Sequence, residues 1–442
     1  MLSPSSECSR QAASLDQADP LARFRAEFFL PDGQVYLDGN SLGPLSRRAE
    51  AHLQRVIGEW RNLGISGWTD AQPPWISLSE TTATLVAGLV GAQPDEVAVT
   101  GSTTGNLHQL LATLFEVGGT LGPNSPKPSG CKTSPTVIVA DELNFSSDLH
   151  AVQSHLRQRG LDPARHLRLI RSRDGRTLHV EDIIAAFTPE VQLVVLPAVQ
   201  FVSGQLLDVT AITRAAHDRG ILIGWDCSHS IGAVPHALGR DGVDFAFWCH
   251  YKYLNAGPGS VGGLYLNRRH HGRAPGLAGW WGVRPDRRFA LAPQHEPAPD
   301  ATALHVGTPH LLSLAPLAGS MEIMTEAGGV AALRLKSLAL TAFLMEWADR
   351  NLAGLGFSVV TPRDDHARGG HVALAHAEAW RICQALKAAG VVPDFRRPDI
   401  IRLAPAPLFN RFTDCAAAVA ALQDIVRTGA HEKFPAQRAL VT

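Results

Sequence analysis

Short apolar segments alternate with amphipathic segments between about residues 96 and 266 of the 442-residue chain. Apolar runs rich in Val and Ile, such as TVIVA and VQLVVLPAV, precede stretches with helical periodicity, such as SSDLHAVQSHL and VTAITRAAHDRG. Runs that are apolar on both faces are typical of strands in a parallel sheet that helices cover on both sides. The pattern therefore predicts an α/β fold built on a mostly parallel sheet.

The pattern changes after about Leu311, where the long helical stretch VAALRLKSLALTAFLMEWADRNLAGLG precedes short strands and a last helix near DCAAAVAALQDIVRTG. We expect an N-terminal arm and helix that pack with the small domain (residues 1–60), a large α/β domain (residues 61–310) and a small C-terminal α+β domain (residues 311–442). Residues 118–135 are dense in Gly, Pro and Ser, which predicts a surface loop, and we assign no function to it.

Composition narrows the class of partner. The chain is 45% apolar and 18% charged with a formal net charge of -1, so it is an ordinary globular sequence with no overall field to attract nucleic acid or an anionic membrane. A small-molecule substrate is the default expectation. The six cysteines show no metal-binding spacing, and no apolar run approaches the roughly 18 to 20 residues that cross a bilayer. We therefore expect no metal and a cytoplasmic location.

Lys252 is one of only six lysines in a chain with 34 arginines, and it directly follows the apolar segment FAFWCHY. Desolvation at the end of a buried strand favours a neutral amine, which is the form that makes a Schiff base with an aldehyde. The alternative is a lysine whose stem is buried while its charged end reaches water. The residue alone leaves both open.

Asp226 ends the apolar segment ILIGW, 26 positions before Lys252. A carboxylate at the carboxyl end of a parallel strand faces the crevice where such sheets bind ligands. In a pyridoxal-phosphate enzyme this carboxylate would keep the pyridine nitrogen protonated. A turn or helix-capping aspartate is the alternative. His229 follows in the same turn and could contact the same cofactor, or serve a structural role.

Two further segments carry side chains that could bind a flat cofactor with a phosphate group. TGSTTGNLHQLL opens a helix after the strand EVAVT, so Thr103 and Thr104 are candidates for a phosphate cradle at the positive end of the helix dipole. Simple helix capping is the alternative. Phe145 follows the next strand and could lay its ring on the cofactor, although an isolated Phe is usually part of a core. Asp148, three residues later, supplies a second carboxylate.

The order of phosphate turn, stacking aromatic, aspartate and lysine is similar to that of fold-type I pyridoxal-phosphate enzymes. Moreover, YLDGNSLGPL, TGNLHQLL, DCSHSIGA, CHYKYLNAGPG, LAGWWG and IRLAPAPLFN resemble the signature segments of kynureninases, in the same order. The resemblance covers residues 36–410. It implies a class V aminotransferase-like fold, pyridoxal 5'-phosphate as the cofactor, and a homodimer with its active sites at the interface.

Kynureninases hydrolyse L-kynurenine to anthranilate and L-alanine, and the resemblance implies that reaction here, in tryptophan degradation or NAD biosynthesis. It implies that Lys252 holds the cofactor and moves the Cα proton, that Asp226 pairs with the pyridinium, and that Tyr251 donates a proton near the phosphate. The remaining cofactor contacts that it implies are Thr103, Thr104, Phe145, Asp148 and His229, with Trp280 and Thr308 reaching a phosphate across the dimer interface.

On the substrate side, the resemblance implies that Arg402 holds the α-carboxylate, for which its two-pronged donor geometry is suited. An ion pair at the surface or between domains is the alternative. Asn40 and Ser41 lie in the turn GNSLG, which resembles the substrate-side loop and also suits a plain turn. Trp68 stands where some animal members carry histidine, and Thr308 where they carry asparagine. The choice between kynurenine and 3-hydroxykynurenine therefore stays open.

Two rival functions remain. One is another enzyme of the same fold, an aminotransferase or a cysteine desulfurase. A desulfurase needs a cysteine on a mobile loop, whereas Cys383 and Cys415 lie in stretches with helical patterns. The other is a non-catalytic binding module of the same fold, which the presence of Lys252, Asp226 and Arg402 disfavours.

Overall fold

The computed structural model describes residues 6–117 and 135–437, and most of the expected loop at residues 118–135 lies outside that part. Five strands of the large sheet, β4, β3, β5, β6 and β7, are parallel, and β8 runs against its neighbours β7 and β2. The predicted α/β fold with a mostly parallel sheet is confirmed. In spatial order the strands are β2 (Val97–Val99), β8 (Gly262–Leu266), β7 (Phe245–Cys249), β6 (Leu222–Asp226), β5 (Val191–Pro197), β3 (Val137–Asp141) and β4 (Leu167–Ile170).

Helices cover both faces of this sheet because its strands are apolar on both sides. In β5, Val194 belongs to the core formed with α4 and α9, whereas its neighbours Leu193 and Val195 belong to the core formed with α5 and α6. Alternate residues of a strand point to opposite faces, so a continuous apolar run serves two cores at once. The helices of the large sheet are α4 (Trp75–Val90), α5 (Thr103–Leu114), α6 (Ser146–Gln158), α7 (Pro163–His166), α8 (Val180–Ala185) and α9 (Val209–His217).

The carboxyl ends of β6 and β7 carry the candidate chemistry. Strand β6 ends at Asp226, and the connection from β7 to β8, residues 250–261, contains Tyr251 and Lys252. This connection holds no crossover helix. A direct return of this kind joins antiparallel neighbours, which explains why β8 runs against the rest of the sheet.

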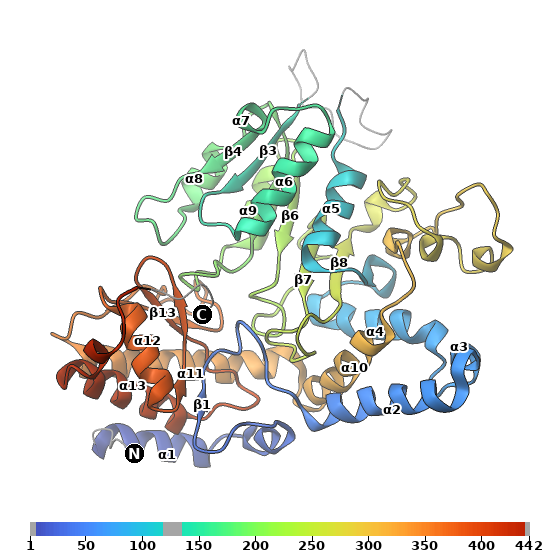
Figure 1. Cartoon of the computed structure of the whole chain (residues 1–442). Helices are drawn as coiled ribbons and strands as arrows, with labels where there is room; N and C mark the ends of the chain where they lie inside the picture. The colour runs from blue at the N-terminus through green and yellow to red at the C-terminus, as the bar shows by residue number, and fades with distance from the viewer. Residues whose placement is uncertain (1–5, 118–134, 438–442) are drawn as a thin grey trace.

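The C-terminal part has its own antiparallel sheet, in the order β12 (Asp394–Arg396), β13 (Ile400–Leu403), β10 (Val372–Ala375) and β9 (Ser358–Val359). Figure 1 shows β13 and its helices below and to the left of the large sheet. A separate core joins these strands to α12 and α13. The other elements of this part are α11 (Gly329–Leu352), α12 (Ala379–Ala388), α13 (Phe412–Arg427) and the parallel pair β1 (Val35–Tyr36) and β11 (Val391–Val392).

The N-terminal segment forms helix α1 (Ser6–Gln17), whose Cys8 and Ala12 are buried in the C-terminal core. Helix α10 (Leu311–Glu326) packs against α2 (Arg47–Leu63) and α4, and Leu314 and Leu317 join the core of the large sheet. The domain boundaries at residues 60 and 310 stay predictions.

Within the described part of the chain, no single helix is long and apolar enough to cross a membrane; α10 and α11 meet that test only as a pair bent by 75°.

Candidate active site

Lys252 lies at the centre of a group of polar side chains from the ends of β6 and β7. Its Nζ is 2.9 Å from Nε2 of His229 and 5.9 Å from the centre of the Tyr251 ring. Burial, followed by the nearby charges of Lys252 and Arg402, lowers the pKa of His229 well below its ordinary value. Its imidazole is therefore neutral, and its Nδ1 is buried without a hydrogen-bond partner.

Asp226 and Asp148 form a buried carboxyl pair beside Lys252. Burial is the largest cause that raises the pKa of both, and the charge of Asp226 raises the pKa of Asp148 further, well above its ordinary value. Lys252 and the Ser228 amide, which donates to Asp226 at 2.8 Å, oppose the rise at Asp226. Two neighbouring buried carboxyl groups do not both ionise freely, and the charge of Asp226 favours the protonated form of Asp148.

The first turn of α5 lies close to the first turn of α6. Thr104 Oγ1 is 2.7 Å from Oγ of Ser147, while Ser102 caps α5 by accepting a hydrogen bond from the Gly105 amide at 3.2 Å. Thr103 is the first residue of the helix. Hydroxyl groups and backbone N–H groups thus gather at the positive end of the α5 dipole, as an anion site requires.

Phe145 precedes α6 and is half exposed, with its ring edge-on to Phe201 at 5.5 Å between centroids. Phe201 in turn lies 6.3 Å from His229, measured between ring centroids. The ring of His371, at the start of β10, is 6.0 Å from that of His229 on the same measure. Side chains of the large sheet and of the C-terminal sheet therefore meet around His229.

Arg402 connects this group to the turn that holds Asn40 and Ser41. The side chain is fully buried in β13, and it donates to the carbonyl of Phe201 and, at 3.2 Å, to Oγ of Ser41. Its Nε donates to Oδ2 of Asp394 at 2.6 Å. The expectation that Arg402 and Ser41 belong together is consistent with this contact. Arg402 does form an ion pair, but the pair is buried and lies within the C-terminal sheet, not at the surface or between domains.

The loop of Asn40 contains buried polar atoms that the chain does not satisfy. Neither Nδ2 nor Oδ1 of Asn40 has a hydrogen-bond partner, although the residue is completely buried. Burial and the charge of Asp394 raise the pKa of Asp38 to about 6. Buried polar groups without partners are rare in native proteins, so these atoms mark a place where a ligand can supply the missing hydrogen bonds.

Trp68, Trp280 and Thr308 do not join the Lys252 group within one chain. Trp68, in α3 (Gly67–Asp70), packs on Trp281 with 5.5 Å between ring centroids, and Trp281 lies edge-on to Trp280 at 4.9 Å. Thr308 is exposed beside the start of α5. Figure 1 shows α3 at the opposite end of the molecule from β13.

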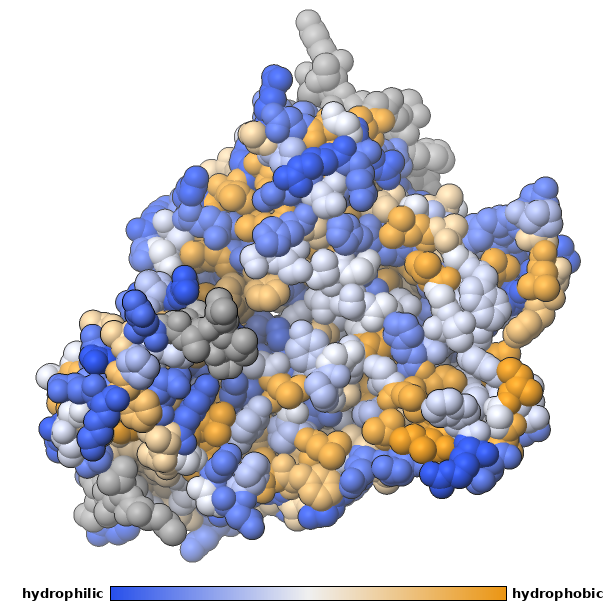
Figure 2. Space-filling view, viewed as in Figure 1, coloured by the Kyte–Doolittle hydropathy of each residue, from blue (hydrophilic) through white to orange (hydrophobic). Residues whose placement is uncertain are grey.

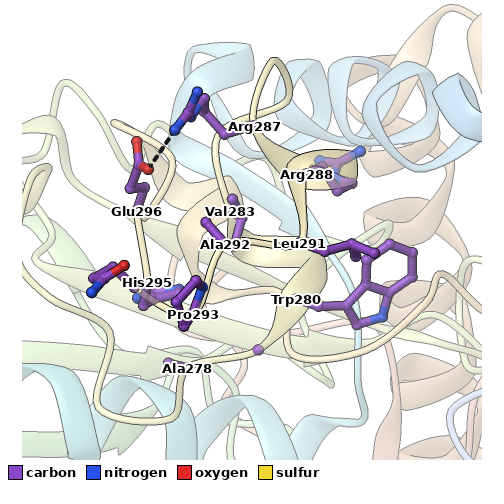
Figure 3. A pocket seen from close by; sticks show the side chains of 12 residues that line it. Ala278, Trp280, Val283, Arg287, Arg288, Leu291, Ala292, Pro293, His295 and Glu296 are labelled. Atoms are coloured by element: carbon purple, nitrogen blue, oxygen red, sulfur yellow. Dashed lines mark hydrogen bonds and ion pairs between the residues drawn. The ribbon is translucent and has the colours of Figure 1, made fainter.

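Trp280 lines a separate cavity of about 380 Å³. Figure 3 shows Trp280 and Leu291 at one edge of this cavity, and the ion pair of Arg287 and Glu296 at another.

Three contributors were missed by sequence reasoning: Phe201, His371 and Asp394. Phe201 lies just beyond the end of β5, so the rule that singled out Asp226 at the end of β6 could also have identified it. No comparable signal exists for His371 and Asp394, which come from the C-terminal sheet. Among the described residues, no three or more His, Cys, Asp and Glu side chains are arranged to hold a metal ion.

Comparison with known proteins gives a consistent assignment. The family described as "Kynureninase C-terminal domain" matches residues 333–422. A kynureninase of Geobacillus thermodenitrificans is 51% identical over 430 residues, which cover 97% of each of the two chains. A kynureninase of Bacillus anthracis is 48% identical with the same coverage.

Solved structures share the fold at lower identity. The cystine C–S lyase C-DES, in complex with its product cysteine persulfide, superimposes with a TM-score of 0.75 at 17% identity, covering 89% of this chain and 98% of that chain. A cysteine desulfurase from Escherichia coli gives a TM-score of 0.74 at 19% identity, covering 92% and 98%. These likenesses confirm the expected fold class. Because the curated relatives match over nearly their whole length at about half identity, the chain belongs to the kynureninase family.

Proposed function

We propose that the chain is a pyridoxal-phosphate enzyme that hydrolyses the Cβ–Cγ bond of L-kynurenine to anthranilate and L-alanine. The observation that carries this proposal is the 51% identity to a curated kynureninase across 97% of both chains. The proximity of Lys252, His229 and the Asp148–Asp226 pair supports it, because these side chains form a reactive centre at the carboxyl end of the sheet.

The residues at this centre fit pyridoxal phosphate. Asp226 offers a buried negative charge for a protonated pyridine nitrogen, and the first turn of α5 offers hydroxyl and amide donors for a phosphate. Oδ2 of Asp148 and Nδ1 of His229 are buried without partners, so a polar ligand between these elements would satisfy them. A solved variant of C-DES, 17% identical with a TM-score of 0.74 over 89% of this chain and 97% of that chain, holds glycine covalently linked to its PLP cofactor.

Each side chain would then have a definite task. When bound, pyridoxal phosphate supplies the electron sink that permits cleavage of the carbon–carbon bond. The amine of Lys252 would hold the cofactor and then move the proton at Cα of the substrate. Burial raises the pKa of Tyr251 above its ordinary value, which keeps its phenol protonated and able to donate. Phe145 would lay the exposed face of its ring on the flat cofactor.

The substrate would be held from the C-terminal side. Arg402 would bind the α-carboxylate through its planar fork, with Ser41 and Asn40 as neutral hydrogen-bonding neighbours. Asn40 has both of its side-chain polar atoms free for this purpose. The task of Trp68, against the aryl group of the substrate, depends on a second copy of the chain, because Trp68 packs with Trp281 and away from Lys252.

A comparison of substrates tests the proposed reaction. Purified protein loaded with pyridoxal phosphate is expected to cleave L-kynurenine. L-cysteine serves as the comparison substrate for a desulfurase, and a pair of an amino acid and a keto acid serves as the comparison for an aminotransferase. Adding 3-hydroxy-L-kynurenine shows which of the two aryl substrates is preferred. Faster sulfur release from L-cysteine than cleavage of L-kynurenine would contradict the proposal.

The surface supports a homodimer. Of the 14 large apolar side chains that are exposed in the described chain, six lie within residues 277–312: Leu277, Trp280, Phe289, Leu291, Val306 and Leu312. Large exposed apolar patches typically mark protein–protein contacts. Figure 2 shows further apolar surface at the lower right, on the side where α2 and α3 lie. We place Trp68, Trp280 and Thr308 on this surface, where they would complete the site of a partner subunit.

Mixing two inactive variants tests that arrangement. Lys252→Ala removes the reactive amine and Trp280→Ala removes the side chain that would reach into the partner. A mixed dimer would contain one site with both changes and one site with neither, so an equal mixture with random assortment should recover about a quarter of the wild-type sites. If Trp280 served its own chain instead, every mixed dimer would contain two damaged sites and no activity would return.

We also propose a cytoplasmic role in tryptophan degradation or NAD biosynthesis. The five cysteines within the described part of the chain are free thiols, which suits a reducing compartment.

A further inference from the structure

The guanidinium of Arg402 is almost fully occupied before any substrate binds. Of its five N–H groups, the Nε and one Nη2 group donate to Oδ2 of Asp394, the second Nη2 group donates to Ser41, and one Nη1 group donates to the carbonyl of Phe201. Among the described residues this leaves a single N–H group of Nη1 for a new ligand. A substrate carboxylate can therefore bind by two N–H groups only if an existing acceptor gives way.

The acceptors differ in strength along the two edges of the guanidinium. The side edge, Nε with Nη2, faces the carboxylate of Asp394, whereas the end edge, Nη1 with Nη2, faces the neutral oxygens of Phe201 and Ser41. A guanidinium attracts a carboxylate through opposite charges as well as hydrogen bonds, whereas a neutral carbonyl or hydroxyl oxygen offers it only the hydrogen bond. An incoming carboxylate would therefore displace the neutral acceptors and leave Asp394 in place.

The fold holds Asp394 where it can act as this permanent partner. Asp394 and Arg402 are directly opposite each other in the antiparallel pair of β12 and β13, so their side chains lie on the same face of the sheet. Nη2 of Arg396 also forms an ion pair with Oδ2 of Asp394 at 3.0 Å. Asp394 thus lies between two guanidinium groups, and its charge compensates the buried charge of Arg402 when no substrate is present.

We propose that Asp394 is a positioning residue for the substrate site. It holds the side edge of the Arg402 guanidinium and thereby directs the end edge toward the substrate α-carboxylate. In the free protein, Ser41 and the Phe201 carbonyl occupy that end edge. The inference rests on the proposed function, because it takes Arg402 as the residue that binds the carboxylate. In this arrangement the substrate carboxylate replaces Ser41 and the Phe201 carbonyl on Arg402, while the ion pair between Arg402 and Asp394 stays intact.

The test compares ligands with and without a carboxylate. Asp394→Asn keeps the shape of the side chain but removes its charge, so Arg402 loses its anchor. We expect the KM for L-kynurenine to rise roughly 10- to 100-fold while kcat and the affinity for kynuramine, the same molecule without its α-carboxylate, stay within about twofold. Steady-state kinetics and titration of the cofactor absorbance give the two readouts.

Asp399→Asn is the matched control, since it makes the same chemical change in the same hairpin but alters a side chain that pairs with Arg176. Asp394→Glu keeps the negative charge on a longer side chain, so it should bind L-kynurenine more tightly than Asp394→Asn does. This variant provides the test if Asp394→Asn folds poorly. Equal weakening of L-kynurenine and kynuramine, or kinetics for Asp394→Asn that match those of Asp399→Asn, would overturn the positioning role alone. A wild-type protein that does not cleave L-kynurenine would instead refute the proposed function, and this inference with it.

Discussion

Replacing Lys252 with alanine is expected to abolish both turnover of L-kynurenine and covalent attachment of pyridoxal phosphate. The reason is local: Lys252 provides the amine at the carboxyl end of the large sheet, 2.9 Å from the neutral His229 and beside the buried Asp226. A nucleophilic amine cannot be replaced by a methyl group. Mass spectrometry of the borohydride-reduced protein, with an anthranilate assay, measures the two losses.

Lys387→Ala is the control for this experiment, because Lys387 lies exposed at the end of α12, remote from the reactive centre. It should keep both the cofactor and the activity. The fold of Lys252→Ala should also survive, since the amine forms no ion pair with any residue that the structure describes, and circular dichroism can verify it. A cofactor found on Lys336 or Lys387 of the wild-type protein would show that the site has been placed on the wrong lysine.

Asp226→Asn is expected to lower turnover roughly 100- to 1,000-fold, the scale seen when a group that stabilises developing charge is removed. The amide keeps the shape of the side chain but not the negative charge that would hold the pyridine nitrogen protonated. Asp226 is almost completely buried, so water cannot replace that charge. Steady-state kinetics and the cofactor absorbance spectrum of the variant report the loss.

Asp148→Asn is the informative comparison, because burial and the charge of Asp226 raise the pKa of Asp148 and favour its protonated form. An amide can replace a neutral carboxyl group as a donor to Asp226, so this variant should lose far less activity than Asp226→Asn. Equal losses in the two variants would mean that both carboxyl groups carry charge. Unchanged rates in Asp226→Asn would mean that this carboxylate has only a structural role.

The large sheet and its reactive edge could be predicted from the sequence because local periodicity determines them. A continuous apolar run such as VQLVVLPAV has side chains for two cores, and that pattern is visible without any tertiary information. The positions of Asp226 and Lys252 follow from the same logic, since residues directly after parallel strands share one edge of the sheet.

Features that depend on pairing between distant segments could not be predicted from local periodicity. Whether Asp394 lies opposite Arg402 depends on the register of the hairpin of β12 and β13, and a shift by one residue would turn the side chains to opposite faces. The placement of Trp68 beside Trp281, away from Lys252, depends on packing between segments more than 200 positions apart. The raised pKa of Asp148 depends on burial and on the neighbouring Asp226, which the sequence does not show.

Release of fluorescent anthranilate from L-kynurenine by the purified, cofactor-loaded protein is the decisive measurement for the proposed reaction. We expect anthranilate and L-alanine in equal amounts, formed by the wild-type protein and not by Lys252→Ala. A wild-type protein that carries pyridoxal phosphate on Lys252 yet releases no anthranilate from L-kynurenine would contradict it.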